Sequence, residues 1–132
     1  MRLKGKVILV TASTRGIGLA IARACAKEGG IVCMAARDLI RAQEIADQLC
    51  AEGGRVHCVY NDATKPETFL SMVEETVKKA GRIDVLVNNF GTSNPGKDLD
   101  FEHTDPDVFM NTVQLNLRSV FMASQAAARH MA

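Results

Sequence analysis

The chain has 132 residues, enough for one domain with a buried core, and its 47% hydrophobic and 23% charged residues are typical of a globular protein. Sixteen Lys and Arg against fifteen Asp and Glu give a net charge of +1, which argues against a dominant nucleic-acid or anionic-membrane partner. The N-terminus has no secretory pattern, and no apolar run approaches a transmembrane span. We therefore expect a cytoplasmic protein with neither a nucleic-acid nor a membrane partner.

The cysteines and histidines show no pattern of a disulfide framework or a metal centre. They are Cys25, Cys33, Cys50, Cys58, His57, His103 and His130. No two cysteines form a C-x-x-C pair, and each falls in a predicted helix or strand, so we expect buried free thiols in a reducing cytosol. The histidines lack ligand spacing, and we expect no metal site.

Strands and helices are predicted to alternate along the chain. The predicted strands are 6–11, 31–36, 55–60 and 84–87, and the predicted helices are 16–28, one capped by Asp38, one after Thr64 and one after Asp105. The first strand is a continuous apolar run, as expected for a strand covered on both faces. Thr64 and Glu67 have capping-box spacing, and Gly81 is placed to end the third helix.

The last predicted helix follows a long polar loop, 88–104, that contains Pro95. Asp105-Pro106 opens the helix, because Pro is tolerated in a first turn. Its predicted apolar face contains Phe109, Val113, Leu117, Val120 and Phe121. The helix meets no Gly or Pro stop before Ala132.

This order of elements predicts an α/β fold with an open, mostly parallel sheet and right-handed crossovers. A sheet edge after the fourth strand and one face of the last helix are left without partners. We interpret the chain as the N-terminal part of a larger fold, because an uncovered edge is a liability. The alternative is a complete four-stranded domain that oligomerises over that edge.

The turn from Thr11 to Gly18 is a candidate phosphate site. It joins an apolar strand to the start of a helix, whose free N–H groups and dipole favour an anion. Gly16 and Gly18 carry no Cβ, which permits close approach of a phosphate and close packing of helix on strand. The alternative is an ordinary turn with convenient glycines, since one Gly-rich turn is weak evidence.

The end of the second strand indicates which dinucleotide would bind. Ala36 stands where an acid would hold a ribose 2′-OH, and Arg37 follows it. Arg15 is placed to reach the same point from the Gly-rich turn, and two guanidiniums suit one phosphate. We therefore predict NADP(H) rather than NAD(H), although each arginine taken alone is also consistent with a solvated charge. Asp38 is one residue too late for the acid and suits a helix cap.

Two further segments are predicted at the carboxyl edge of the sheet, where ligands bind in this architecture. Asp62 follows the third strand and is placed either to accept a hydrogen bond from an adenine amino group or simply to form a turn. After the fourth strand, Asn88 and Asn89 can tie neighbouring strands together, and Gly91 permits close approach of a ribose or nicotinamide. The alternative there is an Asn- and Gly-rich turn.

Taken together, the motifs resemble the short-chain dehydrogenase/reductase family over the whole chain. They are Thr-Ala-Ser-Thr-Arg-Gly-Ile-Gly at 11–18, Asp62, Asn-Asn-Phe-Gly at 88–91 and Asn116 in Gln-Leu-Asn-Leu. Their order and spacing are more specific than any one of them. The stretch 88–125 looks most like bacterial hydroxysteroid dehydrogenases that act on bile acids.

The resemblance implies a Rossmann-type doubly wound sheet, a nicotinamide cofactor and hydride transfer between the cofactor and an alcohol or ketone, with a steroid as the candidate substrate. In the family's pattern Asn116 supports a water linked to a catalytic Lys, and the complete proteins form dimers or tetramers through their fourth and fifth helices. The implied cofactor-binding residues are Thr11, Ser13, Thr14, Arg15, Gly16, Ile17, Gly18, Arg37, Asp62, Ala63, Asn89 and Gly91.

Three departures from the family pattern bear on function. Ala12 replaces the first Gly of the turn, which is tolerable if its φ is negative, and Phe90 replaces an Ala, so that it is expected to narrow or line the nicotinamide site. The Tyr-x-x-x-Lys pair of the family is absent, because Tyr60 is the only tyrosine and is followed at the fourth place by Thr64. The family's Ser is absent as well, because no serine occupies the end of the next strand that the family pattern expects. We therefore expect residues 1–132 to be a dinucleotide-binding part without the C-terminal catalytic part. Two hypotheses remain: the cofactor half of an NADP-dependent oxidoreductase, or a non-catalytic nucleotide-binding or oligomerising module.

Overall fold

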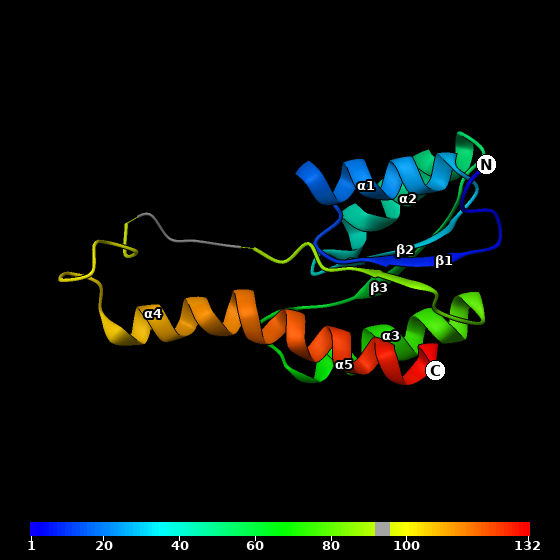
Figure 1. Cartoon of the computed structure of the whole chain (residues 1–132). Coiled ribbons are helices and arrows are strands. Elements are labelled where there is room, and N and C mark those ends of the chain that lie inside the picture. Colours follow the sequence, from blue (N-terminus) through cyan, green and yellow to red (C-terminus); the bar gives the residue numbers. More distant parts are fainter. Residues whose placement is uncertain (92–95) are drawn as a thin grey trace.

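The computed structural model describes residues 1–91 and 96–132 and contains a four-stranded parallel sheet flanked by helices (Figure 1). The strands are β1 (Val7–Val10), β2 (Ile31–Ala36), β3 (Arg55–Tyr60) and β4 (Val85–Val87), and the helices are α1 (Gly16–Lys27), α2 (Leu39–Ala51), α3 (Glu67–Ala80), α4 (Pro106–Val113), the π-helical η1 (Gln114–Arg118) and α5 (Ser119–Met131). The strand order β3-β2-β1-β4 places β1 at the centre. This is the predicted Rossmann-type sheet, and its strands end at one common edge.

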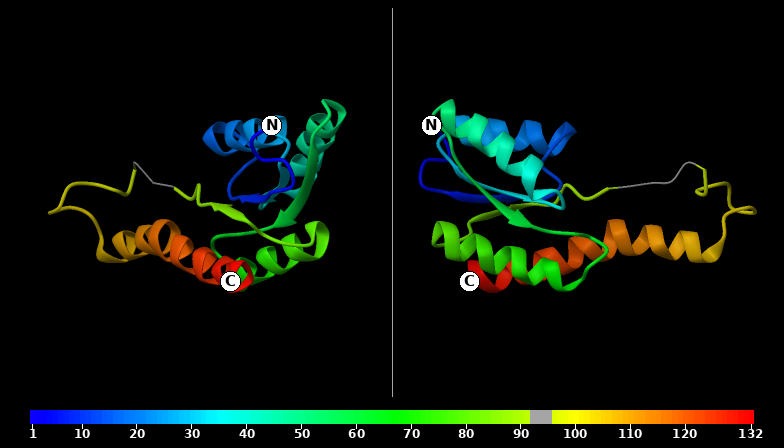
Figure 2. Two further views of the ribbon diagram at one scale, coloured as in Figure 1. Left: turned by 45° about the vertical axis from the view of Figure 1, so that its right-hand side comes forward. Right: turned by 180° about the vertical axis from the view of Figure 1, so that it is seen from behind.

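The helices cover both faces of the sheet. Helices α1 and α2 lie on one face, and α3 and α5 lie on the other (Figures 1 and 2). The apolar run of β1 is buried throughout because its side chains alternate between the two layers, with Ile8 packed toward α1 and α2 and Leu9 packed toward α3 and α5. The prediction of a strand covered on both faces is confirmed.

Two predicted helix ends are confirmed and one is wrong. Asp38 accepts the backbone N–H of Arg41 at 3.1 Å, and Gly81 ends α3 with φ +87°. The predicted capping box at Thr64 does not form, because the Asp62 carboxylate accepts both the hydroxyl and the backbone N–H of Thr64, at 2.7 and 2.9 Å. Asp62 thus takes the Thr64 backbone N–H that Glu67 would accept in a capping box, and α3 begins later, at Glu67.

The last helix differs from its prediction in two ways. It is divided by the π-helical turn η1, so the extra residue there rotates α5 relative to α4. The residues buried against α3 are small ones, among them Ala123 and Ala127. The predicted apolar face points largely outward instead, with Phe109 59%, Leu117 67% and Phe121 65% exposed. Helix α4 lies beyond the carboxyl edge of the sheet, as Figure 2 shows.

The remaining expectations from the sequence concern the polar loop before α4 and the burial of the cysteines. Residues 92–95 of that loop, Pro95 included, lie outside the described residues. All four cysteines are free, and Cys33 and Cys58 are buried as expected. Cys25 is half-buried and Cys50, near the end of α2, is exposed, so the expectation of burial is wrong for Cys50. Within residues 1–91 and 96–132, no helix has the length and apolar character needed to cross a membrane.

Candidate functional site

The turn after β1 is held by its own buried hydroxyl groups. The Thr11 hydroxyl donates to the Val87 carbonyl at 3.3 Å and accepts the backbone N–H of Asn89 at 2.8 Å. On the other side, the hydroxyl of Ser13 donates to the carbonyl of Ala35 at 3.4 Å. Thr11 and Ser13 are fully buried, so they hold the turn between β2 and β4 instead of lining a cavity.

Glycines make the close approaches that the turn requires. Gly16 has φ +57°, a backbone conformation that favours glycine. A Cβ at Gly18 would lie 2.3 Å from the Ala12 carbonyl oxygen and 2.5 Å from Nδ2 of Asn89, so no larger residue fits there. The same Asn89 amide donates to the Ala12 carbonyl at 3.2 Å, which confirms that this asparagine ties β4 to the turn.

Ala12 does not meet the condition under which its methyl group is tolerated without strain. Its φ is +48°, so its backbone adopts the left-handed conformation, which is unfavourable for a residue with a Cβ. The hydrogen bonds of the neighbouring Thr11 and Asn89 hold it there. Helix α1 then begins at Gly16, with Arg15 at its N-cap and no side-chain hydrogen bond to the cap. The N–H groups of the first turn therefore have no side chain as acceptor at the cap position and are suited to an anion.

A cavity of about 500 Å³ lies at the carboxyl edge of the sheet, beside this turn. It is lined by Ala12, Thr14, Arg15, Ala35, Ala36, Arg37, Asp38, Arg41, Asn61, Asp62, Ala63, Thr64, Phe90, Gly91 and Leu115. The structure thus brings together six of the predicted cofactor-binding residues: Thr14, Arg15, Arg37, Asp62, Ala63 and Gly91. The other six surround the turn and the end of β4 without lining the cavity, and Ile17 is 73% exposed.

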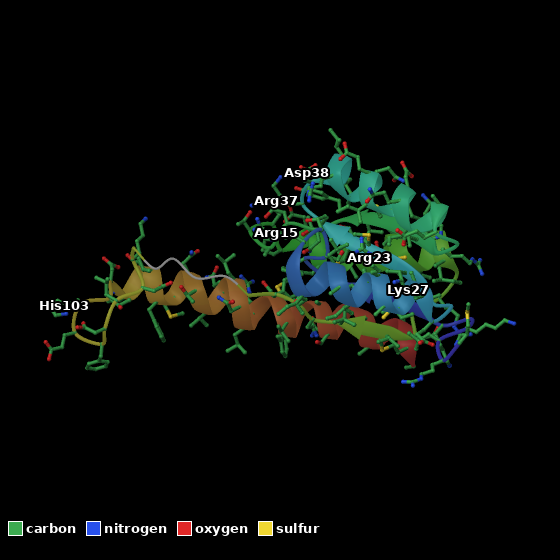
Figure 3. All side chains as sticks on the ribbon, turned by 90° about the horizontal axis from the view of Figure 1, so that it is seen from above. Arg15, Arg23, Lys27, Arg37, Asp38 and His103 are labelled. Carbon is green, nitrogen blue, oxygen red and sulfur yellow. The ribbon has the colours of Figure 1, made fainter. Side chains whose placement is uncertain are left out.

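Three arginines line the cavity, together with the carboxylate residues Asp38 and Asp62. Arg15 and Arg37 both line it, from the turn and from the end of β2, and Arg41 adds a third guanidinium. Figure 3 shows Arg15, Arg37 and Asp38 grouped together, whereas Arg23 lies further along α1. The sequence prediction missed Arg41. Its position three residues after the cap residue Asp38 places it in the first turn of α2, and that spacing was the available signal.

Asp62 forms a turn, which confirms one of its two interpretations, and it also lines the cavity, whereas its contact with an adenine stays a prediction. Its Oδ1 accepts two hydrogen bonds from Thr64. These bonds, with the charges of Lys65 and Arg37, hold the pKa of the Asp62 carboxyl below its usual value. The carboxylate therefore stays ionised at neutral pH and partly balances the guanidiniums across the cavity.

Asn116 lies in η1, next to the segment that follows β4. Its amide donates to the Thr112 carbonyl at 2.9 Å, and a Cβ on Gly91 would lie 3.8 Å from its Oδ1. Asn88 reaches α5, where its amide donates to the Ser124 hydroxyl at 3.1 Å. The asparagines of this region therefore connect β4 to the turn, as predicted, and also to the last helix, which the sequence did not indicate.

Apolar side chains also line the cavity. Phe90 and Leu115 line it, together with Ala63. The sequence prediction had Phe90 narrowing or lining a nicotinamide site, and in the structure it lines this cavity. Leu115 was missed, because its place in the cavity depends on the π-helical turn. In the described part of the chain, no three His, Cys, Asp or Glu side chains are grouped so that they could hold a metal ion.

Comparison with known proteins shows the protein family to which the chain belongs. The family model described as short chain dehydrogenase matches residues 6–132. The chain therefore belongs to the short-chain dehydrogenase family, which confirms the resemblance inferred from the motifs.

Individual proteins of this family are similar to nearly the whole chain. A 7alpha-hydroxysteroid dehydrogenase of Clostridium sardiniense is 45% identical over 130 residues, which are 98% of this chain and 50% of that protein. Its namesake in Bacteroides fragilis is 36% identical over 94% of this chain and 48% of its own length. A metagenomic short-chain oxidoreductase solved in complex with NADP superposes with a TM-score of 0.88 at 28% identity, over 99% of this chain and 58% of that one. The chain spans about half the length of the curated relatives it matches.

Proposed function

We propose that the cavity binds NADP(H), with the 2′-phosphate of the adenosine ribose beside the arginines. The observation that supports this most is the convergence of Arg15, Arg37 and Arg41 on one cavity beside a helix N-terminus without a side-chain cap. Guanidiniums donate forked, charge-assisted hydrogen bonds that suit a phosphate. Ala36 lines the same cavity and offers no carboxylate to a ribose 2′-OH.

The residues present fit a dinucleotide in two further respects. The close packing at Gly18, where a Cβ would clash with the Ala12 carbonyl, leaves the start of α1 in a position suited to a pyrophosphate. Asp62 and Ala63 would lie beside the adenine. A bound nicotinamide would supply the hydride, and we propose an alcohol or carbonyl partner. A hydroxysteroid such as a bile acid is the favoured class, because three relatives carry the name 7alpha-hydroxysteroid dehydrogenase.

A second hypothesis concerns the 132-residue chain by itself, which we propose binds the cofactor without turning over a substrate. Its single tyrosine, Tyr60, lies at the end of β3, and its hydroxyl accepts a hydrogen bond from Lys65 at 3.2 Å. Neither residue lines the cavity. We expect no NADPH oxidation by the purified chain with any ketone tested. Turnover that Asn116→Ala abolishes would contradict this.

The outward face formed by α4, η1 and α5 supports a proposal of self-association. Phe109, Leu117 and Phe121 expose apolar surface along it. We propose that a homo-oligomer of the complete protein, a dimer or a tetramer, covers this face.

Equilibrium binding tests the cofactor assignment. We expect the chain to bind NADPH roughly 10-fold or more tightly than NADH, measured by nucleotide fluorescence, because the arginines gain one phosphate. Arg37→Ala should weaken NADPH roughly 10-fold and leave NADH within about twofold. Arg23→Ala is the matched control, since Arg23 lies on α1 outside the cavity. Equal or tighter binding of NADH, unaffected by Arg37→Ala, would overturn the assignment.

A further inference from the structure

The outer edge of β3 carries backbone groups that face away from the sheet. In the described part of the chain, β3 pairs with β2 alone and is therefore an edge strand. Directly after β3, the backbone N–H of Asn61 donates to the Ala36 carbonyl of β2 at 3.1 Å. Consecutive residues of a strand direct their N–H and C=O groups to opposite sides. Cys58 and Val56, the third and fifth residues before Asn61, therefore direct theirs to the open side.

Two side chains cover the outward carbonyls of this edge. Lys79, near the end of α3, donates from Nζ to the Cys58 carbonyl at 2.7 Å. The thiol of Cys50, near the end of α2, donates to the Val56 carbonyl at 3.7 Å. A hydrogen bond from an ammonium is charge-assisted and strong, whereas one from a thiol is weak. Lys79 is therefore the main cover of the edge.

Without a cover, β3 has the properties of a strand that pairs with other chains. It is six residues long, and its Val56, Cys58 and Val59 side chains are each at most 7% exposed. Such an edge is a ready template, because its free N–H and C=O groups can extend the sheet with a strand of another molecule. The complementary strand that is always at hand is β3 of a second copy, arranged antiparallel about a two-fold axis.

Lys79 opposes that pairing in two ways. An incoming N–H needs the Cys58 carbonyl as its acceptor, and the Lys79 ammonium already occupies it. Two β3 strands that pair about Cys58 would also bring both Lys79 ammonium groups to the same place, where like charges repel. A neutral side chain at this position would oppose the pairing in neither way.

We infer that Lys79 closes the outer edge of β3 to a second copy of the chain. The inference is independent of the nucleotide cavity, whose described lining includes neither Lys79 nor Cys58. It also concerns a different surface from the outward face of α4, η1 and α5, so the chain can associate there while its sheet edge stays closed. In this account Lys79 determines which surface of the molecule is open to self-association.

The test measures the mass of the 132-residue chain by light scattering, and amide hydrogen exchange of residues 55–60, at increasing protein concentration. Lys79→Met keeps an apolar stem of similar length and removes the charge and the donor. We expect its mass at high concentration to reach roughly twice that of the wild type. Exchange within residues 55–60 should slow roughly 10-fold or more as the edge becomes paired. Lys79→Arg keeps a charged donor and should behave like the wild type.

Lys78→Met is the matched control, since it removes the same charge from the adjacent position of α3. Its side chain leaves the helix about 100° away from that of Lys79. It should keep the mass and the exchange rates of the wild type. Lys79→Gln, which keeps a neutral donor, should show the changes of Lys79→Met to a smaller extent, and it replaces that variant if Lys79→Met does not fold. A folded, uncharged variant at position 79 that matches Lys78→Met would overturn the inference. A rise in mass without slower exchange at 55–60 would overturn it too, because the new contact would then lie elsewhere.

Discussion

At the scale of the residue, Ala12 shows how the site constrains the backbone. Glycine accepts a φ of +48° without cost, whereas a Cβ makes that conformation unfavourable by about 1–2 kcal/mol. The hydrogen bonds around Thr11 and Asn89 hold the strained conformation in place. Local strain of this kind is often found at functional sites, and here it falls in the turn that lines the cavity.

Ala12→Gly should therefore stabilise the protein. Relief of the left-handed strain exceeds the additional backbone entropy of glycine, so we expect the free energy of unfolding to rise by about 0.5–1 kcal/mol. Urea denaturation measures the change. Ala20→Gly is the control, because Ala20 is exposed in the middle of α1 and its replacement should cost about 1 kcal/mol. A fall in stability for Ala12→Gly would contradict the argument.

Asp84 makes the start of β1 sensitive to acid. Its Oδ2 accepts the backbone N–H of Val7 at 2.8 Å, and its Oδ1 accepts Nη2 of Arg82 at 2.6 Å. The Val7 bond, with help from Arg82, lowers the pKa of the Asp84 carboxyl from its usual value. The folded protein thus favours the ionised form. The stabilisation is fully present above the ordinary aspartate pKa of about 4, and it is lost as pH falls through the lowered pKa.

The prediction for Asp84→Asn follows from that sign. The variant should be less stable than the wild type at pH 7, and its stability should fall less steeply below about pH 4, because one titrating group has been removed. Urea denaturation from pH 7 to pH 2.5 measures both slopes. If the two proteins lost stability in parallel throughout the acid range, the assignment to Asp84 would be wrong.

At the scale of the element, strands and helix ends are predicted correctly where no nearby residue competes for the same interaction. The apolar run of β1, the cap residue Asp38 and the stop at Gly81 all formed as expected. The capping box at Thr64 failed because the carboxylate of Asp62, two residues earlier, accepts the Thr64 backbone N–H that Glu67 would accept in the box. The pattern considers only the spacing of Thr64 and Glu67 and leaves out other acceptors nearby.

The last helix shows a second kind of limit. Its apolar periodicity indicated a single helix with Phe109, Leu117 and Phe121 on its buried side. Tertiary packing instead placed alanines against α3 and introduced the turn η1. Small residues permit close helix packing, but alanines are only weakly hydrophobic. The side of α5 that packs on α3 is therefore not evident from the apolar pattern of the sequence. Leu115 could not be assigned to the cavity from the sequence for the same reason, because its direction depends on η1.

At the scale of the whole molecule, the cavity is assembled from segments far apart in the chain. The turn after β1 and the ends of β2, β3 and β4 were predicted to meet, because parallel strands end at one edge. Arg41 was missed since it belongs to a helix and not to a strand end. The side-by-side position of β1 and β4, which brings Asn89 to Ala12, requires the strand order and cannot be obtained from local patterns.

The central claim is that the arginines of the cavity hold a 2′-phosphate, and ³¹P NMR of bound NADP⁺ tests it most directly. A free phosphomonoester has a second pKa of about 6, and nearby guanidiniums favour the dianion. We therefore predict that the 2′-phosphate resonance of bound NADP⁺ titrates about one pH unit or more below that of the free nucleotide. Arg37→Ala should return it toward the free value, and Arg23→Ala should leave it unchanged. A bound 2′-phosphate that titrates like the free nucleotide would contradict the account.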